Sequence, residues 1–252
     1  MASPPLSPRR RRRPPVLQDP RPSPAISRSR HRCAGIPPGC DLQLYSSASD
    51  PAVLALGLGD EWISRELRRA TPTLADALSR TNQCLVLRGE VSDPPTLDYF
   101  RDAVGLVMAL VESGGLAVFD PHMFKWWTAD EWRELAFDPA GPVPRHHVVI
   151  LVTDEPTSGA KWFHTRGLWK FGRPDLSVHS VTPDLEAGVT DLLNRFIEML
   201  AFGAIVTDGQ AIRMKSLPAH WRCFHRGTLD DPDFNNVHIE IGPEPAEKSV
   251  RA

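Results

Sequence analysis

The stretch Lys161–Val181, KWFHTRGLWKFGRPDLSVHSV, decides the fold predicted from this sequence, because it joins two strand-like runs through a corner rich in glycine and proline. Gly167 is expected to end the first strand. Leu168 and Phe171 are spaced for a single helical turn. Gly172 is typical of the residue that closes such a turn, and the proline two positions later prevents further helix. The sequence therefore predicts a strand, one helical turn and a second strand.

The same stretch holds the densest mixture of aromatic, basic and histidine side chains in the chain. Strand alternation puts Trp162, His164 and Arg166 on one face. His164 and Arg166 are candidate catalytic residues, and Lys170 and Arg173 are candidate binding residues, because such side chains can converge on a carboxylate or phosphate. The alternative is a structural corner whose basic side chains are solvated.

Two further groups of candidates follow an expected strand near residue 119. Asp120 and His122 stand where catalytic side chains often lie, at the end of a strand, although such a pair also occurs in purely structural turns. Trp126 and Trp127 are candidate anchors for a partner protein, since tryptophan is enriched at binding hot spots. The alternative for both tryptophans is that they fill the core.

Metal binding would require about four ligands that converge on one point. His220, Cys223 and His225 are close in sequence, but alternation predicts a core-facing strand rather than a converging set. The segment 231–236 is rich in oxygen ligands, yet Asn236 stands where a calcium loop has glycine. We therefore predict no metal site.

Cofactor and nucleophile motifs are incomplete. The pair Gly57 and Gly59 lacks the third glycine of a dinucleotide-binding loop, because Trp62 occupies that position. The sequence contains no Walker-type phosphate loop and no Gly-x-Ser-x-Gly elbow. We expect no cofactor.

The remaining pattern predicts an α+β fold with a mixed or antiparallel sheet of about six to eight strands. Two long helices, expected at about 94–113 and 183–202, would pack on one face of that sheet. A strand, the first helix and another strand over 84–119 suggest a βαβ unit or a split version of one. The run HVVILVT at 147–153 is apolar at almost every position, which is typical of a central strand buried on both faces.

Three regions are expected along the chain. Residues 1–45 are predicted to be a disordered leader, because proline and arginine supply too little apolar surface to offset ordering entropy. Residues 46–242 are predicted to form one domain with a helical cap at 46–83, and 243–252 a flexible tail. The leader resembles a transit peptide in composition, but we favour a poorly packed N-terminal extension, for which a start codon placed too early is one of the origins left open.

Charge is divided unevenly between these regions. The chain has 29 Lys and Arg and 31 Asp and Glu, and residues 1–32 hold nine of the arginines and one acid, so the remainder has 20 basic and 30 acidic residues. The acidic body gives no reason to expect nucleic-acid binding, whereas Arg9–Arg13 could make a weak contact with nucleic acid.

The cysteines and the apolar runs bear on compartment. The four cysteines are sparse and form no Cys-x-x-Cys motif, which predicts a reducing, cytoplasmic environment. The longest apolar run, 103–111, is far shorter than the roughly 20 residues that cross a bilayer. We expect no membrane partner.

A pattern extends over about 84–241: a helix, then Thr-x-Gly-Leu (165–168), Phe-Gly-x-Pro-Asp (171–175), a second helix and the Asp-Gly of 208–209. It resembles a group of bacterial α+β domains of unknown function that share these motifs and an Asp-Gly hairpin. The resemblance implies a single α+β domain and assigns no catalytic residue.

Without a complete catalytic set, the sequence favours a non-enzymatic cytoplasmic module that binds another protein, in the manner of bacterial immunity or adaptor proteins. The alternative is a hydrolase or transferase that acts on a phosphate- or carboxylate-bearing substrate through His164 and Arg166.

Overall fold

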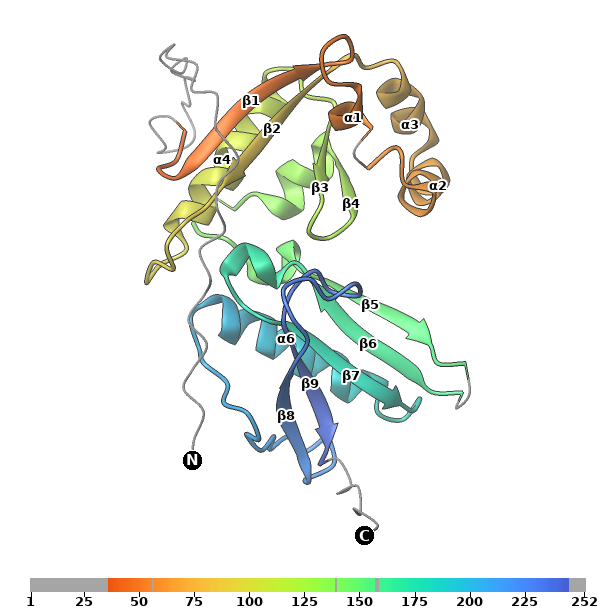
Figure 1. The fold of residues 1–252 in the computed structure, drawn as a ribbon, viewed down its shortest axis with the longest axis vertical. Helices are drawn as coiled ribbons and strands as arrows, with labels where there is room; N and C mark the ends of the chain where they lie inside the picture. The colour runs from red at the N-terminus through yellow and green to blue at the C-terminus, as the bar shows by residue number, and fades with distance from the viewer. Residues whose placement is uncertain (1–35, 56, 139, 157–158, 245–252) are drawn as a thin grey trace.

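The computed structural model describes residues 36–55, 57–138, 140–156 and 159–244. Most of the expected leader and of the expected tail lies outside the described residues. The chain forms an N-terminal half, drawn above in Figure 1, and a C-terminal half below it, which contains a five-stranded sheet.

The N-terminal half contains two small sheets and several helices. Its elements are β1 (Cys40–Ser46), α1 (Pro51–Leu54), α2 (Glu61–Ala70), α3 (Pro72–Ser79), β2 (Gln83–Gly89), α4 (Asp98–Glu112), β3 (Ala117–Asp120), β4 (Lys125–Thr128), α5 (Ala129–Glu131) and the π-helical turn η1 (Trp132–Ala136). β1 pairs with β2 and β3 pairs with β4, both antiparallel. The expected βαβ unit is therefore wrong, because the strands flanking α4 belong to different sheets. β1 also begins inside the segment expected to be a disordered leader.

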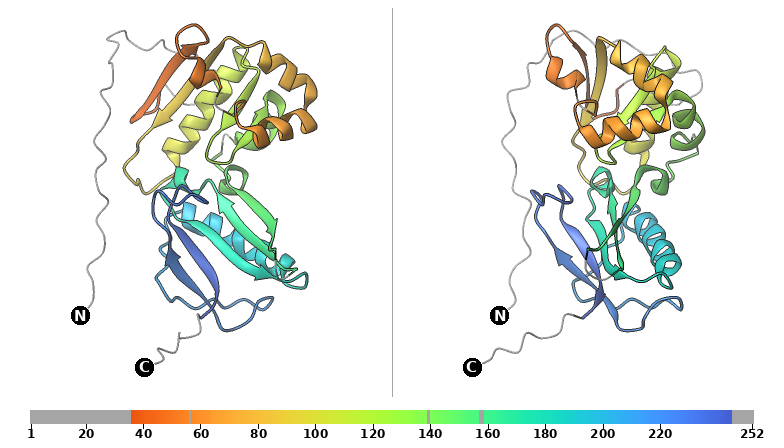
Figure 2. Two further views of the ribbon diagram at one scale, coloured as in Figure 1. Left: turned by 45° about the vertical axis from the view of Figure 1, so that its right-hand side comes forward. Right: turned by 90° about the vertical axis from the view of Figure 1, so that its right-hand side faces the viewer.

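The C-terminal half is a sheet covered by one helix. Its elements are the 3-10 turn η2 (Pro144–His147), β5 (Val149–Asp154), β6 (Lys161–Arg166), the 3-10 turn η3 (Leu168–Phe171), β7 (Asp175–Val181), α6 (Glu186–Ala201), β8 (Trp221–Arg226) and β9 (His238–Pro243). The strand order is β5-β6-β7-β9-β8, and only the β7–β9 pair is parallel. α6 lies against one face of this sheet (Figure 2).

These elements confirm the α+β class and correct the finer prediction. The strands of the described residues form sheets of two, two and five strands instead of one sheet of six to eight. The helices expected at about 94–113 and 183–202 are the shorter α4 and α6, and they do not share one face. The physical reason is that α4 packs on β3 and η1 within its own half, while α6 packs on β7.

The corner between β6 and β7 has the predicted form. β6 ends at Arg166, η3 makes one turn, and Gly172 closes it in the left-handed conformation with φ 68°. Gly167 has φ 120°, and a Cβ there would lie 2.7 Å from the carbonyl oxygen of His147. Both glycines are therefore required by backbone geometry.

One hydrophobic core extends across both halves. It includes Phe100 and Trp127 from the N-terminal half and Leu168, Phe171 and residues of α6 from the C-terminal half. The Phe100 ring centroid lies 4.8 Å from that of Phe171. The two halves are therefore packed together through apolar side chains.

The predicted position of the apolar run at 147–153 is wrong. It forms β5, which pairs only with β6 and lies at the edge of the five-stranded sheet. Its first three residues are half-buried and its last three are exposed. The Asp-Gly at 208–209 likewise forms a turn without a hairpin of two strands. Within the described ranges, no helix is long and apolar enough to cross a membrane.

Replacement of the two corner glycines by alanine should have unequal effects. Gly172→Ala should lower the free energy of unfolding by about 1 kcal/mol, because the left-handed conformation disfavours a Cβ but no atom lies within 4 Å of it. Gly167→Ala should cost at least twice as much, since it adds a clash with a backbone carbonyl. Urea denaturation of both variants checks this, and equal costs would contradict it.

Candidate functional site

His164 and Arg166 lie on the face of β6 that points away from α6, together with Trp162, as strand alternation predicts. Phe163 and Thr165, which alternate with them, are buried on the side of the core. The Trp162 ring is stacked on the His164 imidazole, with 4.0 Å between centroids and 21° between planes. The candidate face of β6 is therefore an aromatic surface as well as a basic one.

Side chains from four segments gather on this face. The histidine–aromatic cluster consists of Trp162, His164, His179, Phe234 and His238. His179 on β7 is 5.1 Å from Trp162, and Phe234 is 5.7 Å from His164 and 4.1 Å from His238, all between ring centroids. Phe234 belongs to the segment between β8 and β9, which therefore covers the face of the sheet opposite α6.

Two imidazoles of this cluster, those of His164 and His238, are neutral near pH 7. His164 is only 6 % exposed, and its Nδ1 has no hydrogen-bond partner among the described residues. Burial, and then the positive charge of Arg166, lower the pKa of His164 to about 4. Burial also lowers the pKa of His238, whose unpartnered Nδ1 lies 3.9 Å from the Asp231 carboxylate. The cluster thus offers imidazole nitrogens that are not already committed to other residues.

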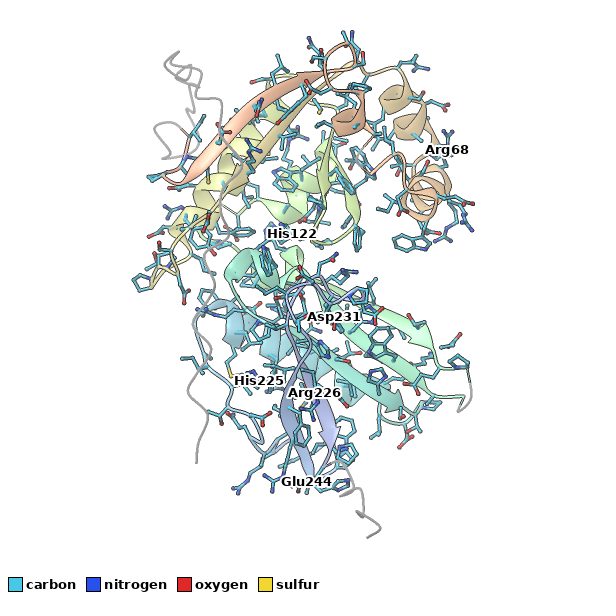
Figure 3. All side chains as sticks on the ribbon, viewed as in Figure 1. Arg68, His122, His225, Arg226, Asp231 and Glu244 are labelled. Atoms are coloured by element: carbon cyan, nitrogen blue, oxygen red, sulfur yellow. The ribbon has the colours of Figure 1, made fainter. Side chains whose placement is uncertain are left out.

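The Arg166 guanidinium lies over the ring of Phe124, 4.4 Å from its centroid. It makes no ion pair within 4 Å in the described part of the chain. Burial lowers its pKa, against the charges of Asp175, Asp233 and Asp231, which raise it. In Figure 3, Asp231 lies at the upper boundary of the C-terminal half, on the segment that covers the sheet. Arg166 is therefore a cation held between the two halves without a fixed acidic partner.

Asp175 organises the corner itself. Its carboxylate accepts hydrogen bonds from Thr165 Oγ1 at 3.0 Å, from the Leu168 N–H at 3.3 Å and from Asn236 Nδ2 at 2.9 Å. Burial raises its pKa to about 6, against these three hydrogen bonds, which lower it. The motif Thr-x-Gly-Leu…Phe-Gly-x-Pro-Asp therefore encodes a structural network.

Lys170 is not a free binding residue, which corrects the sequence prediction. Its ammonium forms a largely buried ion pair with the Asp120 carboxylate, which also accepts a hydrogen bond from the backbone N–H of His122 at 2.9 Å. Asp120 is therefore occupied by a structural contact between η3 and β3. The His122 side chain is exposed at the lower boundary of the N-terminal half (Figure 3).

Arg173 is likewise engaged. Its guanidinium forks onto the carboxylate of Asp93 at 2.8 and 2.9 Å, and its Nε donates to the carbonyl of Leu200 at 2.9 Å. These contacts connect the corner to the loop before α4 and to the end of α6. The predicted convergence of Lys170 and Arg173 with His164 and Arg166 does not occur, because burial next to acids draws Lys170 and Arg173 to other partners.

The two tryptophans are packing residues. Trp127 is only 2 % exposed and belongs to the main core. The Trp126 indole N–H donates to the carbonyl of Gly57 at 3.1 Å, and its ring packs on Phe119. Their prediction as exposed anchors is wrong, because the β3–β4 hairpin turns both rings toward neighbouring elements.

The residues inspected for metal binding do not converge. Cys223 is fully buried, and burial raises the pKa of its thiol to about 11. His225 Nε2 is 2.8 Å from the carbonyl oxygen of Val206. His220 lies outside β8, in the turn before it. Throughout the described ranges, no set of three His, Cys, Asp or Glu is arranged to hold a metal ion.

The sequence alone does not predict that His179, Phe234 and His238 lie beside the β6 residues of the histidine–aromatic cluster. Strand alternation in β9 puts His238 on the face opposite Ile239 and Ile241, which are buried. What no local signal could supply is the parallel pairing of β7 with β9, which sets His238 near β6.

Comparison of the chain with protein-family models, curated proteins and solved structures finds no match. The resemblance to a bacterial domain group of unknown function stays a prediction.

Removing only one of the two charges of the Lys170–Asp120 pair should lower the free energy of unfolding. Asp120→Asn should lower the free energy of unfolding by about 3 kcal/mol, because it leaves a buried ammonium without its counter-charge. Burial alone would raise the pKa of Asp120, but Lys170 lowers it below its ordinary value. The stabilisation should therefore be present above about pH 4 and fall as pH drops through the lower pKa of the folded state.

Chemical denaturation between pH 3 and 8 would measure this dependence. The double variant Asp120→Asn/Lys170→Met should lose less than the sum of its single changes, because it removes both charges. Arg195→Ala, which breaks an exposed pair with Asp191, should cost at most about 1 kcal/mol. A cost for Asp120→Asn as small as this control would contradict the prediction.

Proposed function

We propose that this chain is a non-enzymatic protein-interaction module of the immunity or adaptor type, and that it contacts its partner protein around Phe202. The supporting observation is that Phe202, just after α6, is 61 % exposed between two hollows. Ile205, three residues further on, is 87 % exposed. Large apolar side chains gathered on one surface are typical of interaction sites.

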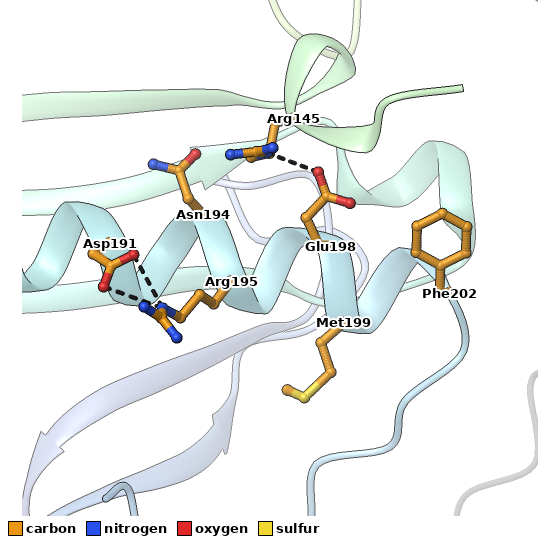
Figure 4. Close-up of a pocket in the computed structure, with 7 residues that line it drawn as sticks. All are labelled: Arg145, Asp191, Asn194, Arg195, Glu198, Met199 and Phe202. Atoms are coloured by element: carbon orange, nitrogen blue, oxygen red, sulfur yellow. Dashed lines mark hydrogen bonds and ion pairs between the residues drawn. The ribbon is translucent and has the colours of Figure 1, made fainter. Parts of the chain in front are cut away.

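The first hollow has a volume of about 500 Å³ and lies along the outer side of α6 (Figure 4). The second has a volume of about 350 Å³, and its lining includes aromatic and proline residues together with the Arg173–Asp93 ion pair. Besides Phe202, the first is lined by Arg145, Asp191, Asn194, Arg195, Glu198 and Met199. Phe202 is shared by both, so a partner could place an apolar side chain on either side of its ring.

The charges around Phe202 favour a protein partner over a nucleic acid. Arg145 pairs with Glu198 at 2.8 Å, and Arg195 pairs with Asp191 at 3.0 Å. The rim is therefore polar and close to neutral, which suits a protein surface with an apolar centre. Arg9–Arg13, the segment considered for nucleic-acid contact, lies outside the described residues. We place the module in the cytoplasm because its four cysteines are sparse and form no Cys-x-x-Cys motif.

A photo-reactive phenylalanine analogue at position 202, introduced in the native host, should yield one discrete adduct on illumination. A matched analogue at Leu44, a strand residue that is also exposed, should yield no such adduct, because it lies on β1 away from both hollows. Glu198→Lys should reduce the adduct by reversing one charge of the rim. Gel electrophoresis with mass spectrometry measures both, and an identical adduct at position 44 would contradict the proposal.

The alternative proposal is a hydrolase or transferase for a phosphate- or carboxylate-bearing substrate. The observation that favours it is the unpartnered Nδ1 of His164 close to the unpaired guanidinium of Arg166. A neutral imidazole can accept a proton, and a guanidinium can bind an anion. Against it, neither of the two hollows beside Phe202 includes His164 or Arg166.

Under this alternative, the protein should hydrolyse p-nitrophenyl phosphate or p-nitrophenyl acetate, and the double change His164→Gln/Arg166→Gln should lower the rate by about 100-fold or more. The control is Arg226→Gln on β8, because Arg226 is a strand arginine that packs over an aromatic ring as Arg166 does. Rates that are equal in the wild type and the double variant, with unchanged circular dichroism, would remove the basis of the enzyme proposal.

A further inference from the structure

The strand β5 has the amino-acid pattern of a central strand at the position of an edge strand. Its residues 149–152 are Val-Ile-Leu-Val, apolar on both faces, and Val152 is 48 % exposed. Natural edge strands are commonly protected by proline, lysine or a bulge. β5 contains no proline or lysine, and its pairing with β6 is regular over six residues. The sequence of β5 therefore suits a strand with a neighbouring strand on each side, but within the described residues β5 pairs with β6 alone.

The opposite edge of the same sheet is covered by the chain itself. On the side of β8 that faces away from β9, the N–H of Cys223 donates to Gln210 O at 2.9 Å, and Cys223 O accepts from the N–H of Gly209 at 2.7 Å. A further bond runs from Ile212 N–H to Trp221 O at 2.8 Å. The Asp-Gly turn thus serves as a cover for the backbone of β8. No equivalent segment of the described chain lies beside β5.

The uncovered edge presents regular backbone groups. In an antiparallel pair, every second residue points its N–H and C=O away from the neighbouring strand. Along β5 these outward groups make no hydrogen bond within the part of the chain that the structure describes. They can accept a strand from another molecule, the mode of recognition known as strand addition.

The two ends of β5 differ in charge. Arg145 precedes the strand in η2, where its side chain is 54 % exposed although it also pairs with Glu198, and the exposed Asp154 is the last residue of the strand. An antiparallel second β5 would bring the acidic end of one strand toward the basic turn of the other, while apolar side chains meet on both faces. We infer that β5 pairs with β5 of a second copy of this chain, which joins two five-stranded sheets into one continuous sheet.

This inference goes beyond the proposed contact around Phe202, because it concerns the backbone edge of β5 and would hold whether or not Phe202 binds a partner. The symmetric arrangement is isologous, since the same edge is used by both copies. It also explains why both faces of β5 are apolar, because in the dimer the strand is central.

The test is the mass of the full-length protein in solution, together with hydrogen exchange along β5. At about 100 μM, sedimentation equilibrium should give a weight-average mass close to twice that of one chain, since with a Kd near 10 μM about 80 % of the chains are dimeric. Val152→Lys should halve the observed mass, because an edge lysine opposes strand pairing. The matched control Leu44→Lys, on an exposed strand residue in the other half, should remain dimeric.

Hydrogen exchange distinguishes the loss of pairing at β5 from a general loss of stability in a variant. In the wild type, the outward amides of β5 should exchange more slowly at 100 μM than on dilution to about 1 μM. In Val152→Lys this dependence should vanish while the amides of the central strand β7 stay protected. A monomeric wild type at about 100 μM, or a dimer that persists in Val152→Lys with unchanged exchange in β5, would overturn the inference.

Discussion

The buried carboxylate of Asp175 is the constraint on which the C-terminal half depends. Removing a carboxylate from water costs several kcal/mol unless hydrogen bonds replace its hydration. Here Thr165, the backbone of Leu168 and Asn236 supply those bonds. Since these donors come from β6, from η3 and from the residues before β9, the carboxylate fixes three segments of the sheet against one another.

The basic residues of the corner connect the two halves of the molecule. Lys170 binds Asp120, Arg173 binds Asp93, and the hydroxyl of Tyr99 donates to the carbonyl of Lys170 at 3.0 Å. Each contact joins the corner to the N-terminal half. Two of the cations that the sequence predicts to bind an anion, Lys170 and Arg173, thus form ion pairs within the protein. Only Arg166 remains without such a partner among the described residues.

The local parts of this structure follow from the sequence, and the long-range parts do not. The turn at Leu168–Phe171 was predicted because Gly167 and Gly172 determine the backbone there within a few residues. The division into three sheets could not be predicted, because apolar alternation states which face of a strand is buried but not which strand lies beside it. The apolar pattern of β5 was recognised, yet its place at an edge depends on pairings far along the chain. The ion pairs of Lys170 with Asp120 and of Arg173 with Asp93 could not be predicted for the same reason.

The parallel pairing of β7 with β9 has a consequence for biosynthesis. Asn236, which completes the hydrogen bonding of Asp175, is 61 residues further along the chain. Before that segment has been synthesised, the Asp175 carboxylate can accept hydrogen bonds from β6 and η3, but the donor from Asn236 is still absent. The corner therefore reaches its final form only after residue 236 has emerged. Completion of the five-stranded sheet waits for β9, which follows its four other strands in sequence and lies between β7 and β8 in space.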